Sequence, residues 1–126
     1  MIRGLTQARA ALLATCAVWL VACGAPHTDT DEAGAQVERG RQLLARYHCG
    51  TCHTIPGVPA AQGRFAASLQ GYGLRSYIVG RVANQPTTLA RWIVEPAALV
   101  PGTLMPSMGV GPDDARHMAA YLGQLR

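Results

Sequence analysis

The sequence predicts a small all-α domain with three to five short helices. Apolar residues recur at helical spacing in two segments, residues 37–47 and 112–125. A third, shorter segment of this kind lies between Pro86 and Pro96. No segment shows the sustained alternation of apolar and polar residues that indicates a half-buried strand. About 90 of the 126 residues lie from Val37 onwards, which is the size of one domain.

Residues 1–22 have the features of a signal peptide. Arg3 and Arg9 make the N-terminus positive, and the apolar stretch over residues 10–22 is too short to cross a bilayer, which takes about 20 residues. The stretch ends in the letters LVAC, which resemble the lipobox of bacterial lipoproteins; an ordinary signal with a chance cysteine is the alternative. We therefore expect cleavage before Cys23, lipid on Cys23, and an exported domain anchored to a membrane, facing the periplasm or the cell exterior.

Residues 23–36 are expected to be a flexible tether. They are small, polar and acidic, and they show no periodicity. The first helix is predicted to follow over residues 37–47, with its apolar face around Leu44. Gly40 lies in the middle of this helix, where glycine costs about 1 kcal/mol relative to alanine. We therefore expect another helix to approach closely at Gly40.

The five residues Cys49-Gly-Thr-Cys52-His53 carry the clearest chemical signal. C-x-x-C-H is the attachment signature of a c-type haem. Each cysteine can bond to one vinyl group of a single porphyrin, and the histidine then becomes an axial ligand of the iron. A zinc half-site is an alternative, but it would need a second pair of ligands, and the other cysteines are Cys16 and Cys23. A thioredoxin-like pair would need a βαβ pattern that the chain lacks.

The segment after the pentapeptide is rich in turns and carries shorter helices. One is expected over Thr87–Val94, opened by Pro86 and stopped by Pro96, with an inner face made of Leu89, Trp92 and Ile93. A second short helix is expected over Ser76–Val82.

A haem iron that is bound by one histidine has one further coordination position, the sixth. A second side chain can fill this position, or it stays open. The candidates are Met105, Met108, His48 and His117. Met105 is favoured, because it lies in an irregular loop and because Pro106 directly after it restricts it to an extended conformation. Met108 could instead pack on the haem edge.

The last helix is predicted over residues 112–125. Gly111 can be its N-cap, a proline opens it, and two aspartates give its first turn the negative charge that favours a helix N-terminus. We expect its apolar stripe to cross the first helix at Gly40, with Tyr121 and Leu122 near the contact. The stripe consists of Ala115, Met118, Ala119, Leu122 and Leu125.

The charge pattern excludes one class of partner. The net charge is +4, and the basic residues form no cluster with interleaved aromatic rings, so we expect no nucleic-acid binding. We also expect a monomer.

The residues from Val37 to Arg126 resemble the class I cytochromes c. Five features match this family in order and spacing, and together they cover essentially the whole predicted domain. They are the helix with Gly40, the pentapeptide, Leu69 with Arg75 six residues later, the run from Thr88 to Pro96, and the loop Pro101-Gly102-Thr103-Leu104-Met105.

This resemblance implies a class I cytochrome c fold wrapped round one covalently bound haem c. It implies that His53 and Met105 are the axial ligands and that Thr103 and Arg75 lie near the haem propionates. It also implies that the ring of Trp92 packs beside the ligating methionine. The family carries electrons, so we expect a carrier and not an enzyme.

Three departures from the family pattern concern the haem surroundings and partner docking. The family usually has a proline whose carbonyl orients the axial histidine, and here the Ala67 carbonyl would have to take that role. The family usually has a tryptophan that donates a hydrogen bond to a propionate, and the corresponding position here falls near Asn84. Asn84 could donate the same hydrogen bond, or it could cap a helix. The family's ring of lysines for partner docking is absent.

The expected function is electron transfer between redox proteins outside the cytoplasm. Similar small cytochromes serve terminal oxidases or periplasmic dehydrogenases, and an oxidase is the favoured partner. One alternative is a haem subunit fixed in a larger membrane complex. Another is a peroxidase-like or gas-reactive haem, which would require Met105 to leave the iron.

Overall fold

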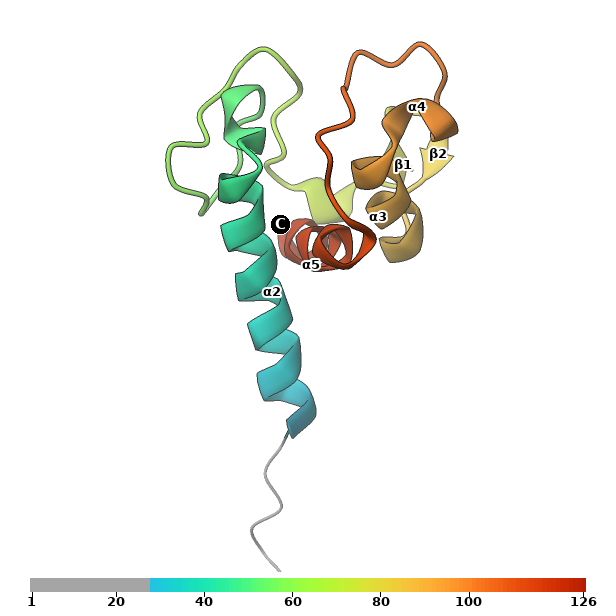
Figure 1. Ribbon diagram of the computed structural model, residues 1–126. Helices are drawn as coiled ribbons and strands as arrows, with labels where there is room; N and C mark the ends of the chain where they lie inside the picture. Colours follow the sequence, from blue (N-terminus) through green and yellow to red (C-terminus); the bar gives the residue numbers. More distant parts are fainter. Residues whose placement is uncertain (1–27) are drawn as a thin grey trace, which may run out of the picture. The chain divides into compact units, whose positions relative to one another are not determined.

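The computed structural model describes residues 28–126, and residues 31–126 form one compact unit (Figure 1). The predicted signal peptide and Cys23 lie outside the described residues. The unit is mostly helical, which confirms the predicted all-α class. No helix among residues 28–126 is long and apolar enough to cross a membrane. The elements are α2 (Thr28–Arg46), η1 (Cys49–Thr51), η2 (Tyr72–Leu74), β1 (Tyr77–Ile78), β2 (Val82–Ala83), α3 (Pro86–Val94), α4 (Pro96–Leu99) and α5 (Pro112–Gln124).

Helix α2 begins nine residues before the predicted start at Val37. The expectation of an irregular tether is therefore wrong for residues 28–36. Their side chains from Asp29 to Gln36 are exposed, so packing against the core does not hold this part of the helix. Asp31 and Glu32 lie near its N-terminus, where negative charge is favourable, and alanine is the best helix former.

Helices α2 and α5 cross at Gly40, as predicted (Figure 1). A Cβ atom at Gly40 would collide with the main-chain carbonyl of His117 and lie 3.0 Å from the Cβ of Tyr121. Only glycine lets the two backbones approach this closely. Helix α5 starts after Gly111 with Pro112 as its first residue, and four of the five predicted stripe residues are buried, while Leu125 is half-buried.

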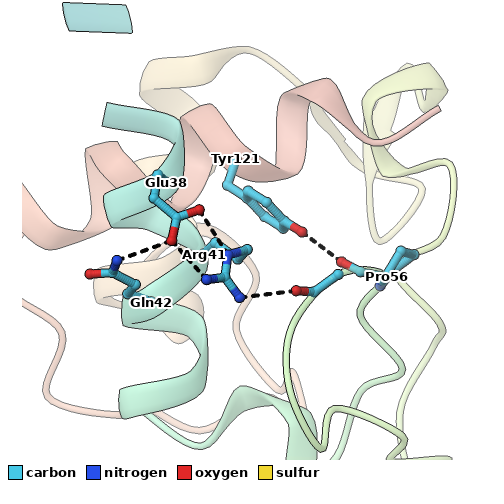
Figure 2. Close-up of polar contacts among 6 residues, drawn as sticks. Glu38, Arg41, Gln42, Pro56 and Tyr121 are labelled. Atoms are coloured by element: carbon cyan, nitrogen blue, oxygen red, sulfur yellow. Dashed lines mark hydrogen bonds and ion pairs between the residues drawn. The ribbon is translucent and has the colours of Figure 1, made fainter. Parts of the chain in front are cut away.

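Side chains of both crossing helices hold the turn that follows the pentapeptide (Figure 2). The Tyr121 hydroxyl donates to the Pro56 carbonyl at 2.7 Å, and Arg41 Nη1 donates to the Gly57 carbonyl at 3.2 Å. Arg41 is itself oriented by Glu38, whose two carboxylate oxygens accept bonds of 2.8 and 2.7 Å from it. Two consecutive carbonyls of one turn are thus fixed to two different helices.

The segment between the pentapeptide and α3 differs from prediction. The helix expected over Ser76–Val82 is wrong, because β1 and β2 form an antiparallel hairpin in which Ile78 pairs with Val82. The chain reverses through Val79 and Gly80, both with positive φ, and a right-handed helix cannot contain such residues. Helix α3 matches the prediction to within one residue, and its buried face is the expected one. The short helix α4 was not predicted.

Candidate haem site

A cleft lined almost entirely by apolar side chains lies within the unit. It contains about 740 Å³ of free space, part of which is open to solvent. Its walls come from α2, the pentapeptide, the loop before η2, α3, the loop before α5, and α5 itself. The cleft therefore draws on almost every helix of the unit.

The pentapeptide forms one wall of this cleft. Cys49, Cys52 and His53 all line it, and both thiols are free. The chain leaves α2 through His48, which has a left-handed backbone with φ 55°, and η1 then winds the pentapeptide into a tight turn. The amide of His53 donates to the Cys49 carbonyl at 3.0 Å, so the first and last residues of the motif are one helical turn apart. Burial raises the pKa of the Cys49 thiol.

The His53 ring is oriented by a main-chain carbonyl. Its Nδ1 donates to the carbonyl of Ala67 at 2.7 Å. This bond leaves Nε2 as the ring nitrogen able to bind a metal, and it fixes the plane of the ring. Ala67 thus provides the carbonyl that a proline usually provides in the family.

Two methionines line the cleft together with the pentapeptide. Met105 is half-buried and packs against the core, whereas Met108 is more exposed. The Thr103 hydroxyl accepts a bond of 3.3 Å from the Met105 amide, which closes a turn before the methionine. Trp92 is 6% exposed and also lines the cleft. Both sulfur atoms remain candidates for an iron ligand, and Met105 stays the prediction.

Arg75, Thr103 and Asn84 are not among the residues that line the cleft. The Arg75 guanidinium donates to the Ser68 carbonyl, and Asn84 Nδ2 donates to the carbonyl of Arg75 at 2.9 Å. These side chains therefore bind main chain near the cleft, and contact of Arg75 or Thr103 with a propionate remains a prediction. Asn84 does not cap α3, whose N-cap residue is Gln85, but the carbonyl that it binds belongs to Arg75, the C-cap residue of η2.

Comparison with known proteins decides the family. The family model described as Cytochrome c matches residues 37–126. The chain belongs to the cytochrome c family. A curated relative, cytochrome c oxidase subunit 2 of Alkalihalophilus pseudofirmus, is 30% identical to this cytochrome over 89 residues. The match covers 70% of this chain and 25% of that relative, so the chain corresponds to a minor part of it. No solved structure matches the chain.

The cytochrome carries a covalently bound c-type haem and is an electron-transfer haem protein. The residues present fit that group. Two free thiols and a histidine held by its other nitrogen lie on one wall, thioether sulfurs lie in the same cleft, and the remaining surface is apolar. The thiols can attach a haem to the chain, the histidine and a thioether can bind its iron, and the apolar surface suits the porphyrin.

Several residues of the cleft escaped the sequence reasoning. Leu44 was expected on the apolar face of its helix and Leu122 near the contact between helices, and both line the cleft. Tyr72 lines it too, and burial raises the pKa of its hydroxyl to about 12. Helical periodicity identifies the buried face of a helix, but it does not tell which buried residues meet a cofactor and which meet another helix.

Proposed function

We propose that this cytochrome is a membrane-tethered carrier of single electrons outside the cytoplasm, and that it delivers them to a respiratory terminal oxidase. We assign His53 and Met105 as the axial ligands of the iron. The observation that carries this proposal is the cleft in which the pentapeptide and Met105 meet. The proposed lipid on Cys23 would keep the carrier near membrane enzymes and raise its effective concentration there.

The lining residues support transfer of electrons and not conversion of a substrate. The haem supplies a one-electron couple when bound. A histidine and a thioether on the iron together leave no position for a substrate, and thioether ligation with an apolar pocket favours the reduced state. Among the described residues that line the cleft, none is an arginine or carries a carboxylate. The chain's own residues therefore hold the iron, exclude water and set its potential.

The proposal of an oxidase as partner rests on the curated relative, which is an oxidase subunit. Docking by a ring of lysines is ruled out, because the chain contains none. Phe65 and Leu104 are instead large apolar side chains left exposed, Leu104 at 94%. Redox encounters bury small interfaces, of less than about 1,200 Å², so a weak apolar contact would suffice for rapid exchange.

The proposed ligand is tested by the optical spectrum of the ferric protein. Wild type should show the weak absorption band of a thioether bound to ferric haem, and Met105→Ala should lose it. Met108→Ala is the matched control, because this methionine also lines the cleft, and it should keep the band. A band that survives in Met105→Ala and disappears in Met108→Ala would move the ligand to Met108.

A second candidate function is that of a haem subunit fixed in a larger redox complex. The relative favours it, because the matching region there is one quarter of a longer oxidase subunit. Mild detergent extraction followed by size-exclusion chromatography distinguishes the two. A carrier elutes alone, whereas a fixed subunit elutes with the haems or copper of a membrane enzyme.

A further inference from the structure

The carbonyl that orients His53 belongs to a segment without proline. Residues 66–70 read Ala-Ala-Ser-Leu-Gln, and none of them has the restricted φ of proline. An unrestrained peptide could turn its carbonyl away from the histidine ring. The bond of 2.7 Å from His53 to Ala67 therefore requires other restraints on this segment.

Main-chain hydrogen bonds supply two of these restraints. The amide of Ala66 donates to the Cys52 carbonyl at 2.9 Å, and the amide of Leu69 donates to the Thr54 carbonyl at 2.8 Å. The two acceptors are the residues immediately before and after His53. The bonds place the two segments side by side, but neither of them includes an atom of the peptide group between Ala67 and Ser68.

Arg75 supplies a third restraint, and it is a side chain. Its Nη2 donates to the Ser68 carbonyl and lies 3.5 Å from the Gln70 carbonyl. The guanidinium carbon lies 5.2 Å from the centre of the Tyr72 ring, and Asn84 holds the main chain of Arg75. The guanidinium of Arg75 thus lies over the Tyr72 ring, and its Nη2 faces the carbonyls of Ser68 and Gln70.

The bond from Arg75 acts on the peptide group next to the Ala67 carbonyl. The Ser68 carbonyl and the Leu69 amide belong to one planar peptide group. Arg75 binds its oxygen and Thr54 binds its N–H, so both ends of this plane are held. A single residue, Ser68, then separates the fixed plane from the carbonyl that His53 needs.

We propose that Arg75 is a positioning residue for the axial histidine: it holds the Ser68 peptide so that the Ala67 carbonyl points at Nδ1 of His53. The inference rests on His53 being the iron ligand proposed above. A ligating histidine that donates its second N–H to a carbonyl is fixed in orientation and becomes a more basic ligand. Arg75 therefore influences the potential of the iron through the histidine, by holding the main chain at Ser68.

The test compares wild-type holo-cytochrome, Arg75→Gln, and Arg75→Gln combined with Ala67→Pro. The measurement is the hydrogen-exchange rate of the His53 Nδ1–H in the reduced protein, by ¹⁵N NMR. Arg75→Gln should accelerate exchange roughly three- to tenfold, which corresponds to about 0.7–1.4 kcal/mol. Proline restricts φ at position 67 and should restore most of the protection. It removes no hydrogen bond found among residues 28–126, since the Ala67 amide donates to none there.

The midpoint potential gives a second measurement in which charge is matched. Arg75→Gln and the double variant carry the same net charge, so a difference between their potentials cannot come from a lost cation. The potential should be lower in the double variant, because a restored hydrogen bond makes His53 a stronger ligand for ferric iron. Arg81→Gln, at an exposed position of the hairpin, removes one positive charge and should leave the Nδ1–H exchange rate unchanged.

Two results would overturn the proposal. One is unchanged exchange in Arg75→Gln, and the other is a loss of protection that proline at position 67 does not restore. If Arg75→Gln fails to mature, Arg75→Met takes its place, because the methionine side chain has no N–H or O–H to donate to the Ser68 carbonyl. An exchange rate equal to that of wild type in Arg75→Met then counts against the role. A wild-type spectrum without histidine ligation would instead refute the proposed function.

Discussion

Several side chains of this cytochrome bind main-chain carbonyls of irregular segments. Arg41 and Tyr121 bind the carbonyls of Gly57 and Pro56, and Arg75 binds that of Ser68. Each of these carbonyls belongs to a loop near the pentapeptide. Irregular segments leave carbonyls without regular partners, so side chains from helices and neighbouring loops provide the missing donors.

The carboxyl of Glu38 provides a test of one such contact by pH. Hydrogen bonds from Arg41, and secondly from Gln42, lower the pKa of Glu38 from 4.5 to about 2. A lowered pKa means that ionised Glu38 contributes stability above pH 4.5 and that this contribution is lost as the pH falls towards 2. In Arg41→Gln the Glu38 carboxyl should titrate closer to 4.5 in an NMR titration.

The matched control for that titration is Arg39→Gln, an exposed arginine on the same helix. It should leave the titration of Glu38 near its wild-type midpoint. A similar shift in both variants would mean that general helix charge, and not the contact with Arg41, lowers the pKa.

Some helices and strands of the domain follow the local sequence pattern, and others differ from it. A helix was expected over Ser76–Val82, but β1 and β2 form a hairpin there. Val79 and Gly80 have positive φ, which a right-handed helix cannot contain. Helices α3 and α5 lie where their prolines and apolar stripes predict them. The approach of α5 to α2 follows from one glycine at their crossing.

The helix crossing is tested with two glycines of α2. Gly40→Ala should lower the free energy of unfolding by about 1–3 kcal/mol, because its new methyl group would collide with the His117 carbonyl. Gly34→Ala should raise it slightly, by up to about 1 kcal/mol, because nothing lies within 4 Å of a methyl group there. Urea unfolding followed by circular dichroism measures both. Equal effects at the two positions would contradict a close crossing at Gly40.

At the scale of the whole molecule, the cleft joins residues that are distant in the sequence. His53 and Met105 come from opposite halves of the predicted domain and line the same cleft. The apolar stripes of α3 and α5 pack together and also face this cleft. A haem held by the pentapeptide in this cleft would pack against the apolar side chains of both helices.

Membrane attachment is tested by changing the proposed lipid site. Cys23→Ser should move the cytochrome from the membrane fraction to the soluble fraction. Each buried acyl CH₂ contributes about 0.8 kcal/mol, and without these chains no stable anchor remains. Haem staining of the fractions measures the change. Cys16→Ser is the control, because Cys16 lies in the segment that is predicted to be removed. The Cys16→Ser cytochrome should stay in the membrane fraction. Membrane retention of Cys23→Ser would refute the lipid anchor.

The sequence by itself determined the cofactor, the family and the positions of helices α3 and α5. Haem attachment depends on a local motif, and helices α3 and α5 on local periodicity and prolines, so both can be read from neighbouring residues. The Ala67 carbonyl was expected from the family resemblance to orient His53, and the structure shows that bond. Only the tertiary structure decided which groups Arg75 binds. It also decided that Met105 and Met108 share one cleft. These contacts join loops that are distant in the sequence, and the periodicity of a helix does not specify which atoms of the loops meet.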